Sequence, residues 1–112
     1  MIIIYKILIY LVIFQSSSIE GKWTCCESKQ NRISNKRNVC DDVEIDSKRI
    51  VVKFNKKTEI YEYVRLENEI TLTKKPGDYF YYSKLKINLK HDKYSEVLEI
   101  SDKNNRIVVL RR

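Results

Sequence analysis

The strongest constraint on the fold of this chain is a strict alternation of apolar and polar residues. Between residues 84 and 90, leucine or isoleucine occupies every second position from residue 85, and lysine or asparagine occupies the others. Successive side chains of a β-strand point to opposite faces of the sheet, so a period of two predicts a strand with one buried face. No segment after Gly21 carries an apolar stripe of helical period over a useful length. The sequence therefore predicts an all-β protein.

Further strand-like segments precede and follow this alternation. They are rich in β-branched and aromatic residues, and the set covers residues 22–27, 49–54, 58–64, 70–73, 79–90, 95–101 and 106–112. A strand over residues 79–90 would span about 40 Å at about 3.3 Å per residue, so we expect a bulge or bend near Ser83. The inward positions of the strands predict a core of Trp23, Phe54, Leu85, Ile87, Leu89, Leu98 and Ile100.

The connections between these segments define the predicted topology. With two glycines and one proline in 112 residues, most turns must be formed by Asn, Asp and Lys. Short connections between sequential strands favour an antiparallel up-and-down meander of seven or eight strands. Such a meander hides its edges by closing into a small barrel, and an open sandwich is the alternative. We expect a single domain over residues 19–112, with a long basic loop at about residues 28–42.

The first eighteen residues have the layout of a secretory signal peptide. One lysine stands within an apolar opening, an unbroken apolar run of residues 7–14 follows, and a glutamine precedes three serines. Ser16 and Ser18 occupy the −3 and −1 positions of a cleavage site before Ile19. An uncleaved membrane anchor is the alternative, although the apolar stretch covers about fourteen residues and a spanning helix needs about twenty. We therefore predict a signal peptide at residues 1–18 and a secreted protein, which meets a membrane only if this segment stays uncleaved.

The three cysteines, Cys25, Cys26 and Cys40, predict one disulfide in an oxidising compartment. Cys25 and Cys26 are adjacent and point to opposite faces of a strand, so only one of them can comfortably face Cys40. If Trp23 points inward, alternation places Cys25 inside and Cys26 outside. We therefore favour the pair Cys26 and Cys40, with Cys25 in place of Cys26 as the alternative. A bond closing this loop would stabilise the protein by about 3 kcal/mol.

The charge of the chain limits the classes of partner. The formal net charge of +7 comes from lysines and arginines that are mixed with acids along the whole length. The densest basic stretch, residues 29–37, could attract anionic surfaces, but a solvated loop explains it more simply. Nucleic acid is not expected as a partner, because no aromatic residues are interleaved with this stretch.

No motif in the chain predicts catalysis, a cofactor or a metal. His91 lies beside Asp92 in a turn, but Ser95 and Ser101 lack the sequence context of a catalytic nucleophile. The acidic residues between positions 41 and 46 lack the spacing and the glycine of a calcium loop. One histidine without a CxxC spacing cannot complete a zinc site. We therefore expect a protein that is not an enzyme.

The order of the elements resembles the small lipocalin-like domains of the calycin type. The residues that carry the resemblance are GKW at 21–23, on the first strand, and the later meander that runs from RIVVKF at 49–54 to RIVVLRR at 106–112. In such domains a G-x-W closes the floor of the barrel, and a basic residue of the last strand often packs on the tryptophan. The resemblance implies this role for Arg111 or Arg112, and it implies binding of a small apolar molecule or, in some members, of a protein.

The tyrosines supply the remaining candidates for a binding site. A phenol has an apolar body and a polar tip, which suits the mouth of a pocket or a protein-binding surface. For a hollow barrel the candidate ligand-binding residues are Tyr61, Tyr63, Tyr79, Tyr81 and Leu85 near the mouth and Trp23 at the floor. We expect a secreted, non-enzymatic binding protein that carries a small apolar ligand in the barrel. The alternative is an interaction module with a solid core, which binds an unidentified protein through an aromatic and basic surface.

Overall fold

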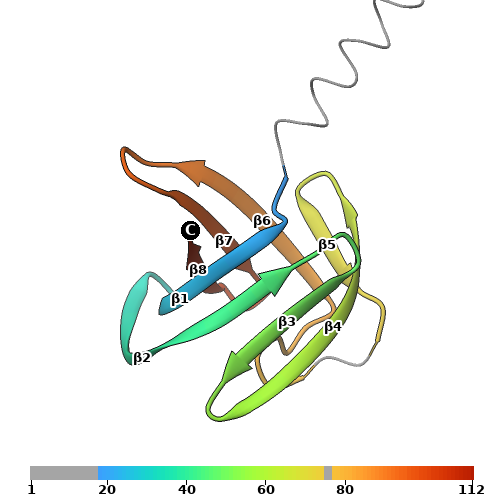
Figure 1. The fold of residues 1–112 in the computed structure, drawn as a ribbon, viewed down its shortest axis with the longest axis horizontal. Helices are drawn as coiled ribbons and strands as arrows, with labels where there is room; N and C mark the ends of the chain where they lie inside the picture. Colours follow the sequence, from blue (N-terminus) through green and yellow to red (C-terminus); the bar gives the residue numbers. More distant parts are fainter. Residues whose placement is uncertain (1–17, 75–76) are drawn as a thin grey trace, which may run out of the picture.

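The computed structural model describes residues 18–74 and 77–112, so residues 1–17 of the predicted signal peptide lie outside the described part of the chain. Within these ranges the chain forms eight strands, which Figure 1 shows. They are β1 (Gly21–Gln30), β2 (Ile33–Ile45), β3 (Arg49–Phe54), β4 (Lys57–Leu66), β5 (Glu69–Leu72), β6 (Lys84–His91), β7 (Glu96–Ser101) and β8 (Arg106–Arg111). No helix in this part of the chain is long and apolar enough to cross a bilayer.

The strands form a closed antiparallel barrel with up-and-down topology. Each strand pairs with the next one along the chain, and β8 pairs back with β1. This confirms the predicted all-β meander and excludes the open sandwich. Because the strands alternate in direction, the β1–β2, β3–β4, β5–β6 and β7–β8 connections lie at one end, which we call the mouth. The start of β1 and the end of β8 lie at the other end, which we call the floor.

The core is built by the same rule on every strand. Each strand contributes to the core cluster two buried apolar side chains that are two residues apart, as the alternation predicts. In chain order these pairs are Trp23 and Cys25, Val43 and Ile45, Ile50 and Val52, Tyr61 and Tyr63, Ile70 and Leu72, Leu85 and Ile87, Leu98 and Ile100, and Val108 and Leu110. The predicted core is therefore confirmed, except that Phe54 and Leu89 are only partly buried and pack against it.

The predicted long basic loop at residues 28–42 is wrong, because this stretch belongs to the β1–β2 hairpin. Asn31 and Arg32 form its two-residue turn with positive φ angles of 50° and 72°. Positive φ at both turn residues is the geometry of a type I′ turn, whose twist matches the flanking strands. Most side chains from residue 30 to residue 40 are exposed. Neither face of the hairpin tip therefore needs apolar residues, so the sequence shows no alternation of apolar and polar residues here.

The predicted strand over residues 79–90 begins only at Lys84, where β6 starts. Residues 79–83 belong to no strand, and Tyr79 and Phe80 among them are both buried. The chain crosses the mouth here before it enters β6. The expected bend is found at Ser83, but the predicted strand over residues 79–83 is wrong.

The disulfide joins Cys26 to Cys40, and Cys25 is a buried free thiol. The bond lies at an irregularity of the β1–β2 pairing, since Cys25 lies opposite Asp41 but Glu27 lies opposite Lys36. The favoured pairing of Cys26 with Cys40 is therefore confirmed. Alternation along β1 explains it, because Cys25 shares the inward face of the strand with Trp23. The bond ties the base of the exposed hairpin to the barrel.

Arg112 closes the floor of the barrel. Its guanidinium lies 4.1 Å from the centroid of the Trp23 ring, donates to the carbonyl oxygens of Ser18 and Glu20, and pairs with Glu96. A Cβ at Gly21 would lie 3.0 Å from this guanidinium, and Gly21 has a φ of +139°. A side chain at residue 21 would therefore strain the backbone and crowd the arginine. Arg112 thus occupies the place on the tryptophan that the resemblance implies, and Gly21 leaves room for it.

Truncation of one core side chain tests the assignment of strand faces. Ile87 is 5% exposed, so Ile87→Ala should lower the free energy of unfolding by about 2–5 kcal/mol. The matched control is Val64→Ala on the outer face of β4, where the side chain is 61% exposed; it should cost less than about 1 kcal/mol. Urea denaturation measures both variants. Equal losses would show that the faces are assigned wrongly.

The burial of Cys25 predicts a difference in reactivity between folded and unfolded protein. An alkylating reagent should leave the native protein unlabelled, because the free thiol is inside the barrel. Denaturation without reduction should then expose one thiol, and peptide mapping should place the label on Cys25. Labelling of Cys26 or Cys40 under these conditions would contradict the disulfide.

Candidate functional site

Five of the six candidate ligand-binding residues lie inside the barrel. Trp23, Tyr61, Tyr63, Tyr79 and Leu85 are all buried, with no more than 7% of any side chain exposed. Tyr81 is 57% exposed, because the chain is not a strand here and the alternation of β6 does not extend back to it. The Tyr63 hydroxyl donates to the carbonyl oxygen of Asp46 at the floor, 2.6 Å away. Tyr63 therefore lies toward the floor and not near the mouth as predicted, whereas Leu85 is the second residue of β6, which begins at the mouth.

The mouth is covered by a cluster of four aromatic rings, which we call the mouth cluster and which consists of Phe54, Tyr61, Tyr79 and Phe80. The ring centroids of Tyr79 and Phe80 lie 5.0 Å apart, those of Phe54 and Tyr79 lie 5.0 Å apart, and those of Tyr61 and Phe80 lie 5.2 Å apart. Tilted and edge-on contacts at these distances are favourable for aromatic pairs. The cluster therefore fills the end of the barrel where a ligand would enter.

Hydrogen bonds from β4 hold this cluster in place. The N–H groups of Tyr79 and Phe80 both donate to the Tyr61 hydroxyl at 3.2 Å, and that hydroxyl donates to Glu59 at 2.9 Å. The N–H groups of Asp78 and Tyr79 also donate to the Glu59 carboxylate. At Gly77 a Cβ would lie 2.3 Å from a Glu59 oxygen and 2.5 Å from the Tyr61 hydroxyl, so a side chain here would push both groups out of these hydrogen bonds.

The protonation states of these groups suit their roles. Burial raises the pKa of Tyr61 to about 12, so its hydroxyl keeps the proton that it donates to Glu59. Burial also raises the pKa of Glu59, but the hydrogen bonds from Asp78, Tyr61 and Tyr79 outweigh it and lower the pKa below its ordinary value. Glu59 is therefore ionised at neutral pH, where it is the stronger acceptor.

Two arginines attach the Tyr79 ring and backbone to the neighbouring strands. Arg106 donates to the carbonyl oxygen of Tyr79 at 2.6 Å, and its guanidinium lies 4.9 Å from the Tyr81 ring centroid. Arg37 lies 5.8 Å from the Tyr79 ring centroid and pairs with Asp41, which is 5% exposed. Neither arginine was a candidate in the sequence, because each reaches the mouth from a strand that is distant from residue 79 along the chain.

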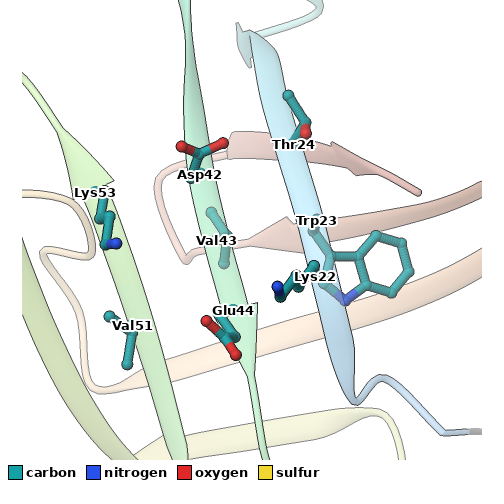
Figure 2. A pocket seen from close by; sticks show the side chains of 8 residues that line it. All are labelled: Lys22, Trp23, Thr24, Asp42, Val43, Glu44, Val51 and Lys53. Carbon is teal, nitrogen blue, oxygen red and sulfur yellow. The ribbon is translucent and has the colours of Figure 1, made fainter.

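A groove of about 420 Å³ lies on the outer face of β1, β2 and β3. Figure 2 shows the Trp23 indole pointing away from the side chains of Lys22, Asp42 and Glu44, so the groove is outside the barrel. Its lining combines acids and bases on facing strands, since Lys22 lies opposite Glu44 and Asp42 lies opposite Lys53. The sequence marks these residues as outward-facing, but it does not reveal the concave shape. With both charges present in equal number, the groove selects no particular ionic ligand.

The structure assembles no catalytic or metal-binding constellation from the residues considered for one. The Ser95 hydroxyl donates directly to Asp92 at 3.2 Å, and His91 lies 3.9 Å from Glu96. This arrangement is not the Ser–His–Asp relay, in which histidine lies between the other two. Across residues 18–74 and 77–112, no three His, Cys, Asp or Glu side chains are grouped so that they could hold a metal ion.

Comparisons of the chain with protein-family models, with curated proteins and with solved structures find no match.

The Glu59 carboxylate predicts how stability depends on pH. The pKa of Glu59 in the folded state lies below the ordinary value of 4.5. Its contribution to the free energy of unfolding is therefore complete above about pH 4.5, and it is lost as the pH falls through the lower pKa of the folded state. Thermal melting from neutral pH to about pH 3 should show a steeper loss of stability in the wild type than in Glu59→Gln. Glu69→Gln, at an exposed position of β5, is the matched control and should follow the wild type. Parallel curves for wild type and Glu59→Gln would contradict this role for Glu59.

Proposed function

We propose that this chain is a secreted, non-enzymatic, lipocalin-like binding protein with a solid core, which binds its partner through its outer surface at the mouth. Secretion is supported by the signal-like first eighteen residues together with the Cys26–Cys40 disulfide, since disulfides persist in oxidising compartments. The lipocalin-like assignment is supported by Gly21, Trp23 and Arg112, whose geometry at the floor matches what the resemblance implies.

The observation that carries the proposal is the filled mouth. The buried candidates for a ligand pocket belong to one core cluster, and two of them, Tyr61 and Tyr79, pack against Phe54 and Phe80 at the mouth. An eight-stranded barrel can be filled by its own side chains or can hold one small ligand, and the buried rings at the mouth support the filled form here. The partner is therefore expected to bind to the outer surface, where Tyr81 provides an exposed ring and Arg106 a cation.

The second candidate function is the carriage of a small apolar ligand inside the barrel. It is favoured by the irregular course of the chain across the mouth, since side-chain hydrogen bonds rather than a strand ladder hold Tyr79 and Phe80 there. A ligand would have to displace this segment and open space between packed side chains. The solid-core proposal requires neither step.

A titration with apolar probes separates the two functions. The chain has one tryptophan, and Trp23 lies at the floor of the barrel, so its emission reports directly on the interior. The secreted form should show no change in Trp23 emission and no displaceable binding across a panel of fluorescent fatty acids and retinoid analogues. Displaceable binding with quenching of Trp23 would contradict the solid core and would support the small-ligand function instead.

A further inference from the structure

The four connections at the mouth form one continuous surface. The N–H of Asn31 in the β1–β2 turn donates to the carbonyl oxygen of Asn105 in the β7–β8 turn. In the β7–β8 turn, Asn104 donates to the hydroxyl of Tyr82 in the β5–β6 connection. That connection is joined in turn to the β3–β4 hairpin by the ion pair between Asp78 and Lys57. Segments that are far apart in sequence therefore meet at this end of the molecule.

Every hairpin turn on this surface carries a free cation. Arg32 lies in the β1–β2 turn, Lys56 in the β3–β4 turn and Lys103 in the β7–β8 turn, and all three are exposed. In the described part of the chain none of the three forms an ion pair. The acids at the same end are already engaged: Asp78 pairs with Lys57, and Asp102 accepts the N–H groups of Asn104 and Arg106.

The floor is mixed in charge. Each of its turns carries an acid, namely Asp46, Glu67 and Asp92, and two of them also carry an exposed lysine, Lys48 and Lys93. Its arginines are paired with acids as well, including Arg111 with Asp92 at 3.5 Å and Arg112 with Glu96 at 3.1 Å. The two ends of the barrel therefore differ in the charge that they offer to a partner, and only the mouth offers unpaired cations on all of its hairpin turns.

Two aromatic rings lie among these cations. Tyr81 is 57% exposed with the Arg106 guanidinium 4.9 Å from its centroid, and Lys103 lies 4.6 Å from the centroid of Tyr82. A cation over one face of a ring leaves the ring edge and the other face available. We call the set of Arg32, Lys56, Lys57, Tyr81, Tyr82, Lys103 and Arg106 the mouth surface.

The geometry points to a sulfated polysaccharide as the partner of the mouth surface. Such a chain carries repeated sulfates that can meet cations on separate turns, and the C–H face of a sugar ring can pack on the exposed Tyr81 ring. An acidic peptide would need an apolar anchor site or a paired strand on this surface to fix its register. Nucleic acid is rare where a secreted protein acts. The inference rests on the proposed function, because it assigns the chemistry of the partner to the same surface.

Heparin is the probe that tests this inference, with unsulfated hyaluronan, polyglutamate and duplex DNA as competitors. The wild type should bind heparin in low salt and release it as salt is raised. Replacement of the three free cations by Arg32→Asn, Lys56→Asn and Lys103→Gln should weaken binding at least about tenfold. The matched control is Lys48→Asn, Lys86→Gln and Lys93→Asn, which removes the same charge elsewhere on the barrel and should change binding less than about twofold.

A second pair of variants tests the stacking of a sugar on Tyr81. Tyr81→Ser should weaken heparin binding, whereas Tyr94→Ser, at the 88% exposed tyrosine of the β6–β7 turn, should not. Equal losses in the two triple variants, or equal competition by polyglutamate or DNA, would overturn the inference in favour of unspecific attraction between charges. No binding of heparin in low salt would also overturn it. A failure to bind heparin would not contradict the proposed solid core, because the titration of Trp23 emission with apolar probes tests the core separately.

Discussion

Closure of eight strands into one barrel leaves a narrow interior, which its own side chains can fill or which can hold one small ligand. Each strand contributes two inward apolar residues to one core cluster between the floor and the mouth. The two ends must then be sealed without a further layer of structure. At the floor this is done by Arg112 on Trp23, and at the mouth by the rings of Tyr79 and Phe80.

The two seals differ in a way that bears on function. The floor seal joins the start of β1 to the end of β8, so it fixes the closure of the barrel itself. The mouth seal is an irregular segment that depends on Glu59 and Tyr61 for its hydrogen bonds. Because the segment is not a regular strand, Tyr79 is buried while Tyr81, two residues later, lies outside among the cations of the hairpin turns. The same backbone path therefore fills the core and creates the exposed surface.

The parts of this fold that could be predicted are those that depend on alternation alone. Alternation placed Leu85 and Ile87 inside, and it separated Cys25 from Cys26, so the strand faces and the disulfide followed from local sequence. The Asn31–Arg32 turn could not be found in this way, because the hairpin around it is exposed on both faces and has no apolar pattern. The mouth surface was equally hidden, since contacts such as Asn104 with Tyr82 exist only after the barrel has closed.

The central claim is that Tyr79 and Phe80 form a fixed seal over a filled barrel, and amide hydrogen exchange tests it most directly. Both N–H groups donate to the buried Tyr61 hydroxyl, so they should exchange as slowly as the amide of Leu98 in the core strand β7. Exchange as fast as that of the exposed turn residues Lys56 and Lys103 would contradict the account, because it would show a mouth that opens freely.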